Sequence, residues 1–190
     1  MSDRTRILVV AATERELAAP DGWRTLRCGV GPVEAAAATA AAIARHRPAA
    51  ILHVGIAGAL RARALAPGVL VIGTEARYAD LGVSAEWAPN TVLASPALLV
   101  AASRVLPNAP RLVIGTSARI GGSGGTDVEA MEGFAVLRVA QLADIPAIEI
   151  RAIANEIEEH DRARWHFDVA FAALIDVTPR LVEEFASCVH

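Results

Sequence analysis

The sequence predicts an α/β protein built on a central, largely parallel sheet. Short runs of apolar, β-type residues alternate along the chain with segments of helical period. The runs are apolar on both faces, which is typical of strands buried in a parallel sheet. The chain has 190 residues and contains no linker or repeat. We therefore expect a single domain over residues 1–190.

Each expected element follows from its local pattern. Strands are expected where short apolar runs occur, at residues 6–12, 50–55, 69–74, 111–117 and 147–152. Helices are expected where apolar residues recur at helical spacing, at residues 32–45, 96–106, 127–143 and 167–187. Proline at position 32 suits a first helical turn, because the N–H that proline lacks would have no partner there. Proline at position 179 could break the last helix.

The composition excludes several classes of protein. The 18 basic and 21 acidic side chains give a formal net charge of −3, without the basic excess of a nucleic-acid-binding protein. All the basic residues are arginine, which excludes a P-loop or Schiff-base lysine. The alanine-rich segment 33–43 is shorter than the roughly 20 residues that span a bilayer, and residues 1–7 lack the apolar core of an export signal. With two distant cysteines, Cys28 and Cys188, we expect a cytoplasmic protein with reduced thiols and no membrane or nucleic-acid partner.

Polar and glycine-rich residues follow several of the expected strands. Ligands of open α/β sheets bind at the carboxyl ends of the strands. Those ends carry residues 13–16, 55–58, 115–117 with the following glycine loop, and 153–155. We therefore expect a binding site to be formed from these four segments.

Two glutamates stand out as candidates for chemistry. Glu16 follows the first strand, where it is either a site carboxylate or an ordinary acidic residue at a helix N-terminus. Glu132 falls in the apolar stripe of the helix expected over 127–143. Because burial of an unpaired carboxylate costs several kcal/mol, Glu132 either pairs with an arginine such as Arg151 or receives hydroxyl donors such as those of a ribose.

Other patterns favour structural interpretations. The segment 29–34 lacks the third glycine of a dinucleotide-binding fingerprint. The glycines of 121–125 form either an anion cradle or a flexible loop. His53 lies within an expected strand and is interpreted as a buried, satisfied histidine, while Glu149 and Arg151 share one strand face and are expected to pair. The histidines show no paired spacing for a metal, and no G-x-S-x-G motif indicates a serine hydrolase.

Six segments, in their order along the chain, resemble the nucleoside phosphorylase/nucleosidase superfamily. They are AATEREL at 11–17, GVGPVEAA at 29–36, HVGIAGAL at 53–60, EARYAD at 75–80, VEAMEG at 128–133, and the stretch from Ile145-Pro146 to Arg151-Ala152-Ile153-Ala154-Asn155. The resemblance covers essentially the whole chain. It implies a three-layer α/β/α fold with a mixed, mostly parallel sheet, and cleavage of a nucleoside N-glycosidic bond.

The resemblance also implies roles for the two glutamates. Glu16 matches the residue that orients and deprotonates the attacking water in the hydrolytic branch of the superfamily. Glu132 matches the residue that holds the ribose hydroxyls, and Met131 matches the residue that packs under the sugar. Ala57 and Gly58 match positions near the anomeric carbon.

The remaining expected site residues contact the two ends of the nucleoside. By the same resemblance, Ile120 lies in the base pocket and Phe167 lies near the ribose 5′ substituent. Asn155 takes the place of the residue that contacts the purine imidazole nitrogen. An amide donor there suits a 6-oxopurine, because a carboxylate would face the purine carbonyl oxygen and leave two acceptors unpaired.

The segment RAIAN at 151–155, followed by residues 162–166 and an apolar helix, resembles the futalosine hydrolase family. This implies hydrolysis of futalosine to hypoxanthine and dehypoxanthinylfutalosine, a step of menaquinone biosynthesis, without a metal or organic cofactor. Residues 121–125 and 162–165 are expected near the aromatic carboxylate at the 5′ end of futalosine. Relatives are usually homo-oligomers, so a homodimer or higher oligomer is expected.

Three alternatives remain open at the level of sequence. One is a nucleosidase that acts on methylthioadenosine and S-adenosylhomocysteine, and a second is a purine nucleoside phosphorylase. A third is a protein that binds a purine nucleoside without cleaving it. The presence of carboxylates at both Glu16 and Glu132 argues against the third alternative.

Overall fold

The structure is a computed structural model that describes residues 3–122 and 124–189. In these residues, the strands are β1 (Ile7–Ala11), β2 (Arg24–Arg27), β3 (Ala50–Ala59), β4 (Leu70–Tyr78), β5 (Thr91–Leu93), β6 (Arg111–Thr116), β7 (Val128–Ala130) and β8 (Ala147–Glu156). The helices are α1 (Pro32–His46), α2 (Pro96–Val105), α3 (Gly133–Leu142) and α4 (Phe167–Cys188), with short 3₁₀ turns η1 (Arg4–Arg6), η2 (Glu14–Glu16), η3 (Arg61–Arg63) and η4 (Arg162–Arg164). The expected α/β class is confirmed.

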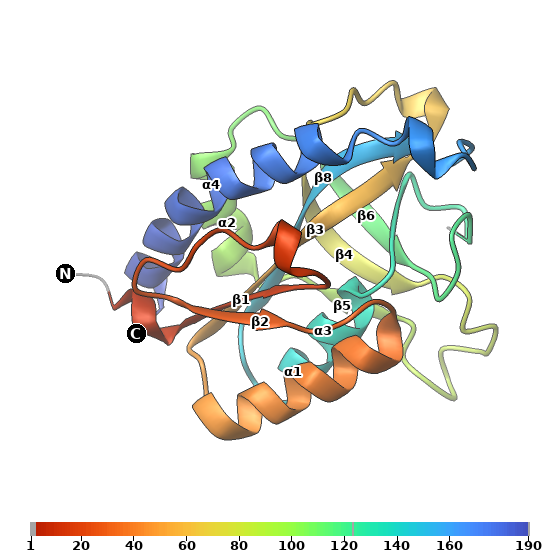
Figure 1. The fold of residues 1–190 in the computed structure, drawn as a ribbon. Coiled ribbons are helices and arrows are strands. Elements are labelled where there is room, and N and C mark those ends of the chain that lie inside the picture. Colours follow the sequence, from red (N-terminus) through yellow and green to blue (C-terminus); the bar gives the residue numbers. More distant parts are fainter. Residues whose placement is uncertain (1–2, 123, 190) are drawn as a thin grey trace.

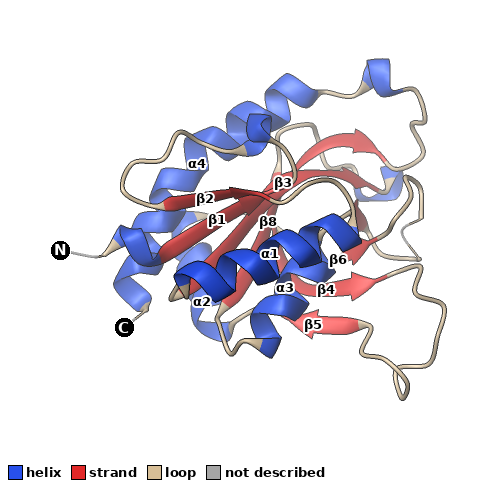
Figure 2. Ribbon diagram, turned by 60° about the horizontal axis from the view of Figure 1, so that its bottom comes forward, coloured by secondary structure: helices blue, strands red, loops and turns tan. Residues whose placement is uncertain are grey.

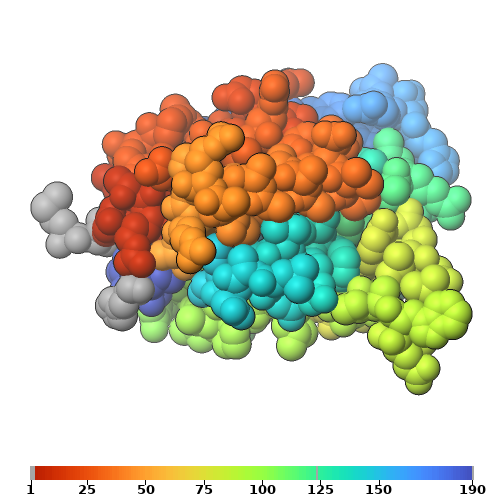
Figure 3. All heavy atoms as spheres, turned by 90° about the horizontal axis from the view of Figure 1, so that it is seen from below, coloured from red at the N-terminus to blue at the C-terminus, as the bar shows by residue number. Residues whose placement is uncertain are grey.

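All the described strands belong to one mixed sheet, which the helices cover on both faces (Figures 1 and 2). Helices α2 and α4 pack on one face, where Leu98, Leu174 and Phe185 are buried against the sheet. Helices α1 and α3 cover the other face, where Ala35 and Leu137 are buried. Figure 3 shows α1 in orange and α3 in cyan side by side on that face. The three-layer α/β/α arrangement is therefore confirmed.

Strand β3 is the centre of the sheet. Its first half pairs in parallel with β1, its whole length pairs in parallel with β8, and its end at Gly58 and Ala59 pairs antiparallel with β7. Strands β8, β4, β6 and β7 complete a closed ring with β3, each paired with the next. Small apolar side chains such as Ala57, Val128 and Ile153 fill the interior next to this ring. The ring thus brings the ends of β3, β7 and β8 together.

Glycine explains why several strands are longer than expected. Strand β3 continues through Gly55 to Ala59, and β4 continues through Gly73 to Tyr78. The expected strands end at Gly55 and, one residue after Gly73, at residue 74, but in the structure each glycine lies within a strand where other groups approach the backbone closely. A Cβ at Gly73, for example, would lie 3.1 Å from the carbonyl oxygen of Glu149. Close approach of this kind is a recognised reason for glycine inside a strand.

The helix expected over 127–143 is wrong at its start. Residues Val128–Ala130 form β7, which bridges β3 and β6, and α3 begins only at Gly133. Glu132 is the N-cap of α3, with φ −125° and ψ −23°, and so does not lie within a helical stripe. All three residues of β7 are buried where the strand pairs with β3 and β6. The stability gained from this burial and pairing outweighs the helical period of the short segment.

Three further differences concern local patterns. Helix α4 runs unbroken through Pro179, where Leu174, Val177 and Leu181 hold the helix against the sheet. The proline is exposed, so water can donate a hydrogen bond to the carbonyl oxygen that loses its helical partner.

Strands β2 and β5 were not expected. Strand β2 is mostly exposed and rich in arginine, and β5 has only three residues.

Within the described residues, none of the helices combines the length and apolar character needed to cross a membrane. The segment between β4 and β5, residues 79–90, projects from one end of the molecule (Figure 3).

Candidate active site

One cavity of about 480 Å³ lies at the carboxyl ends of β1, β3 and β8. This volume is in the range of roughly 300–1,000 Å³ that is typical of small-molecule sites. The structure brings every predicted site residue into its wall: Glu16, Ala57, Gly58, Ile120, Met131, Glu132, Asn155 and Phe167. The other lining residues are Ala12, Thr13, Arg15, Val30, Ile56, Glu129, Ala130, Ile157, Arg162, Trp165 and Phe171. Their roles in catalysis and binding remain predictions, which the cavity makes geometrically feasible.

Glu16 is held rigidly at the wall of the cavity. It is the last residue of η2, and its Oε2 accepts hydrogen bonds from the backbone N–H and the hydroxyl of Thr13, both at 2.8 Å. Its Oε1 accepts the backbone N–H of Ile56 at 3.1 Å. Glu16 thus completes a capping box and also lines the cavity, so the two sequence interpretations do not exclude each other. One lone pair of Oε1 is left for a further donor.

Glu132 is buried on another side of the same cavity, with 4% of its surface exposed. Its Oε1 accepts the backbone N–H of Gly31 at 3.1 Å, and its Oε2 lies 3.4 Å from Nη2 of Arg151. Burial raises the pKa of Glu132, and Arg151 and the Gly31 N–H oppose this shift. Each carboxylate oxygen keeps acceptor capacity, so the contact with Arg151 leaves room for hydroxyl donors.

Arg151 connects these groups from beneath the cavity. Its guanidinium is 1% exposed and its Nε donates to Oε1 of Glu149 at 2.6 Å, which confirms the expected pair. Its Nη2 lies 2.6 Å from Nε2 of His53, and Nη1 donates to the carbonyl oxygen of Ile56 at 3.4 Å. Ile56 therefore contacts Glu16 through its N–H and Arg151 through its carbonyl oxygen, which belong to consecutive peptide groups.

His53 is neutral in this network. Its Nδ1 lies 3.0 Å from the carbonyl oxygen of Val10 and must donate to it, so Nε2 is the acceptor for the guanidinium of Arg151. Burial lowers the pKa of His53 well below its ordinary value, and the charge of Arg151 lowers it further. The interpretation of His53 as a buried, satisfied histidine is confirmed.

Two glycines make space for the network. A Cβ at Gly55 would overlap the guanidinium of Arg151, and one at Gly133 would overlap the carboxylate of Glu149. The Oε2 of Glu149 has no hydrogen-bond partner among the described residues, and burial raises the pKa of Glu149. The backbone at these two glycines therefore closes directly over buried charges.

Asn155 and Glu129 both line the cavity, on the two strands that flank the end of β3. Gly58 of β3 is in register with Asn155 of β8 on one side and with Glu129 of β7 on the other. The register between β3 and β8 shifts between Ala57 and Gly58, which gives β8 an extra residue next to Asn155. Nδ2 of Asn155 donates to the carbonyl oxygen of Glu156 at 2.8 Å, which leaves its second N–H and its Oδ1 free for a ligand.

Glu129 is a site residue that the sequence did not single out. It is 7% exposed, and its Oε1 accepts the N–H of Gly121 at 2.6 Å, while its Oε2 has no partner among the described residues. Burial raises the pKa of Glu129. The sequence interpretation placed it in a helix, whereas its position in β7 is what directs it to the cavity. Of the expected loop 121–125, residue 123 lies outside the described residues.

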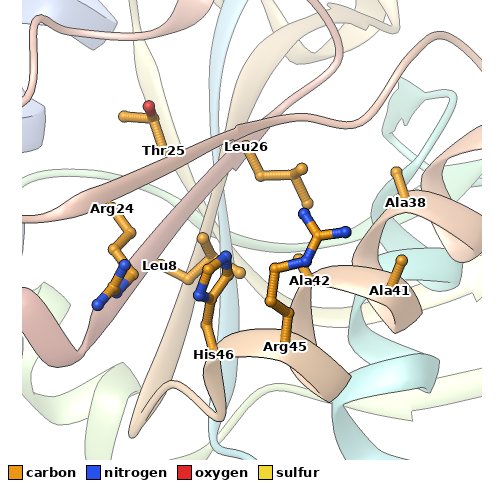
Figure 4. A pocket seen from close by; sticks show the side chains of 9 residues that line it. All are labelled: Leu8, Arg24, Thr25, Leu26, Ala38, Ala41, Ala42, Arg45 and His46. Atoms are coloured by element: carbon orange, nitrogen blue, oxygen red, sulfur yellow. The ribbon is translucent and has the colours of Figure 1, made fainter.

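A second hollow, of about 540 Å³, lies between β2 and α1, and its lining differs from that of the first cavity (Figure 4). Arg24, Arg45 and His46 surround an apolar floor that includes Leu8 and Leu26. None of its lining residues is a carboxylate or a predicted site residue. The convergence of carboxylates favours the first cavity as the candidate active site. In the described part of the chain, no group of histidine, cysteine, aspartate or glutamate is arranged to bind a metal ion.

Comparison with known proteins agrees with this geometry. Residues 25–119, half of the chain, match the model of the phosphorylase superfamily. Futalosine hydrolase of Streptomyces coelicolor is 34% identical over 187 residues, which cover 85% of this chain and 79% of the relative. Futalosine hydrolase of Thermus thermophilus is 30% identical over 190 residues, covering 86% and 82%.

A solved structure shows the same fold. The methylthioadenosine/S-adenosylhomocysteine nucleosidase of Colwellia psychrerythraea, in complex with adenine, superposes with a TM-score of 0.82 at 18% identity over 94% of each chain. The chain belongs to the phosphorylase superfamily and, within it, to the futalosine hydrolase family.

The neutral state of buried His53 predicts a pH-dependent stability. Below about pH 6.5 the imidazole of the unfolded chain takes up a proton, whereas that of the folded protein stays neutral. The free energy of unfolding therefore decreases as the pH is lowered, until the pH reaches the lowered pKa of the folded protein. The fall approaches about 1.4 kcal/mol per pH unit for this one proton. We expect the stability advantage of the wild type over His53→Gln to shrink from pH 7.5 to pH 5, as measured by urea unfolding. The other titrating groups are common to both proteins, and a constant difference would show that His53 is not held neutral.

Proposed function

We propose that this protein hydrolyses the N-glycosidic bond of futalosine, releasing hypoxanthine and dehypoxanthinylfutalosine, in the biosynthesis of menaquinone. The observation that carries the proposal is the convergence of Glu16, Glu132 and Asn155 on one cavity in a member of the futalosine hydrolase family. Family membership supplies the substrate, and the geometry accounts for the reaction as follows.

Glu132 stabilises the reacting sugar. Cleavage of the bond gives the sugar ring an oxocarbenium-like positive charge. Glu132 accepts the ribose hydroxyls with its remaining lone pairs, and its negative charge lies close to the developing cation. Met131, next to it in the cavity wall, packs under the sugar.

Glu16 activates the water. Its Oε2 is occupied by Thr13, so the free lone pair of Oε1 accepts the proton of a water molecule directed at the anomeric carbon. The hydrogen bond from the N–H of Ile56 holds this oxygen in place next to Ala57 and Gly58. A positioned base of this kind contributes typically 10²–10⁴-fold to the rate.

Asn155 assists the departure of the base. Its free amide N–H donates to the purine as negative charge develops there, while its bond to Glu156 fixes the orientation of the amide. An amide is a weak acid, so the proton that neutralises hypoxanthine comes from solvent. Ile120, which also lines the cavity, borders the purine.

The charges around the cavity favour hydrolysis over phosphorolysis. A phosphate nucleophile needs unoccupied cationic donors near the anomeric carbon. Arg151 already directs its donors to Glu149, His53, Glu132 and Ile56. The carboxylates of Glu16 and Glu132 would also repel a phosphate dianion.

We further propose a homodimer or higher oligomer in the cytoplasm. Large apolar side chains are exposed at Trp87 (85%), Leu93 (73%) and Leu142 (69%), which are of the kind that interfaces cover. The thiols of Cys28 and Cys188 are free, as is typical of a reducing compartment.

A chromatographic assay for the free base tests the function directly. Futalosine, aminodeoxyfutalosine and methylthioadenosine are incubated in parallel with the purified protein in phosphate-free buffer. We expect hypoxanthine from futalosine at a rate that added phosphate does not raise. Release of adenine from methylthioadenosine with futalosine untouched would instead support the nucleosidase alternative.

Glu16→Gln is expected to lower kcat for futalosine at least about a hundredfold, because the amide keeps a hydrogen-bonding oxygen but cannot take the proton of water. Binding of substrate, measured by calorimetry, should stay near the wild-type value. Glu14→Gln is the matched control, since Glu14 is exposed in the same turn and does not line the cavity. Near-normal turnover of Glu16→Gln would remove Glu16 from the mechanism.

Asn155→Asp is expected to shift the preference from 6-oxopurine toward 6-aminopurine nucleosides, because a carboxylate repels the purine carbonyl oxygen and accepts an amino N–H. The ratio of kcat/KM for futalosine to that for aminodeoxyfutalosine should fall by at least about tenfold, which corresponds to roughly 1.4 kcal/mol. An unchanged ratio would place the specificity elsewhere, with Glu129 the next residue to test.

A further inference from the structure

The wall of the candidate active site combines two kinds of side chain. The carboxylates of Glu16, Glu129 and Glu132 line it near the strand ends. Arg162 of η4, Trp165, and Phe167 and Phe171 of α4 line it as well. A ligand that fills the whole cavity therefore meets carboxylates and also a cation among aromatic rings.

The aromatic wall is ordered by its own contacts. Trp165 and Phe167 lie 5.5 Å apart between ring centroids, and Phe167 stacks on Phe171 at 6.0 Å. The indole Nε1 of Trp165 donates to the carbonyl oxygen of Glu159 at 3.0 Å, and the N–H of His166 donates to the carbonyl oxygen of Ala154 on β8 at 2.8 Å. This wall is thus fixed relative to the strand that carries Asn155.

Arg162 is placed over these rings without an acidic partner. Its guanidinium carbon lies 5.5 Å from the ring centroid of Trp165 and 6.0 Å from that of Phe167. Its neighbours are engaged, since Arg164 pairs with Glu159 at 2.9 Å and Arg15, which also lines the cavity, pairs with Asp168 at 3.0 Å. In the described residues Arg162 makes no such pair, so the N–H donors of its planar group have no acidic partner although the residue lines the cavity.

We propose that Arg162 and the rings of Trp165 and Phe167 bind an aryl carboxylate at the 5′ end of the nucleoside. A planar guanidinium near aromatic rings still offers two parallel N–H donors at its edge, which fit a carboxylate bidentately. The neighbouring rings offer stacking partners for the aryl group itself. The proposal rests on the proposed function, because futalosine carries such a group at its 5′ position.

A pair of substrates that differ only in this charge tests the proposal. Futalosine and its methyl ester are compared by kcat/KM on the wild type, Arg162→Met and Arg164→Met. Arg164 is the matched control because it lies in the same turn, is already paired and does not line the cavity. We expect the wild type and Arg164→Met to prefer the acid by at least tenfold, and Arg162→Met to treat acid and ester alike, with the loss mainly in KM.

A phosphate-bearing nucleoside and the acid-to-ester ratio distinguish the remaining interpretations of Arg162. Inosine 5′-monophosphate tests whether the same guanidinium takes a phosphate instead, and a preference for it over futalosine that Arg162→Met abolishes would overturn the assignment of an aryl carboxylate. An acid-to-ester ratio near one in the wild type, or a ratio unchanged in Arg162→Met, would also overturn the proposal.

Failure of the proposed function is recognised separately, as wild-type protein that releases no hypoxanthine from futalosine. In that case the thermal stabilisation of the wild type and Arg162→Met by the acid and by the ester is compared. Stabilisation by the acid alone that is lost in Arg162→Met supports the site, and equal effects of acid and ester reject it.

Discussion

The buried guanidinium of Arg151 is the interaction on which the rest of the site depends. A charge removed from water costs several kcal/mol unless neighbouring groups replace its hydration. Here Glu149 of β8, His53 and the carbonyl oxygen of Ile56 in β3, and Glu132 at the N-cap of α3 do so. The cation therefore fixes the relative positions of β3, β8 and the start of α3. It also holds the negative charge of Glu132 next to the cavity, where a reacting sugar becomes positive.

The fold accommodates this cluster by placing glycine where a side chain would overlap the buried charged groups. Gly55 and Gly133 leave room for Arg151 and Glu149, and His53 supplies an uncharged acceptor from the same strand as Gly55. The cluster contains more carboxylates than cations, because Glu132 and Glu149 share the guanidinium of Arg151 and Glu16 is connected to it through Ile56. This excess of negative charge suits a cationic transition state and is unfavourable for an anionic nucleophile. The same local electrostatics thus relate the packing of the sheet to the choice of reaction.

Much of this arrangement could be predicted from sequence, for identifiable reasons. Apolar runs defined β1, β3, β6 and β8, and the rule that sites form at strand ends led to Glu16, Gly58 and Asn155. Sequence similarity to the family supplied Glu132. The helical stripe invoked for Glu132 was wrong, although the inference that its carboxylate is buried and must find donors was right.

What the sequence did not show depends on contacts between distant segments. The three residues of β7 become a strand only because β3 and β6 flank them, and without β7 the position of Glu129 in the wall is not foreseeable. Gly55 looks like the end of a strand until Arg151 is seen beneath it. The sequence leaves pairing with Arg151 and binding of hydroxyl donors as alternatives for Glu132, whereas the structure shows that the residue contacts Arg151 and still lines the cavity.

The capping box at Glu16 has a consequence for how the cavity can work. The carboxylate that is proposed to remove a proton also closes the first turn after β1, so it is tied to Thr13 by two hydrogen bonds and to Ile56 by a third. Such a group has no freedom to swing toward a bound molecule and back. A nucleoside whose anomeric carbon settles slightly out of line is therefore not followed by this carboxylate, and alignment with the water depends on how the nucleoside itself is seated.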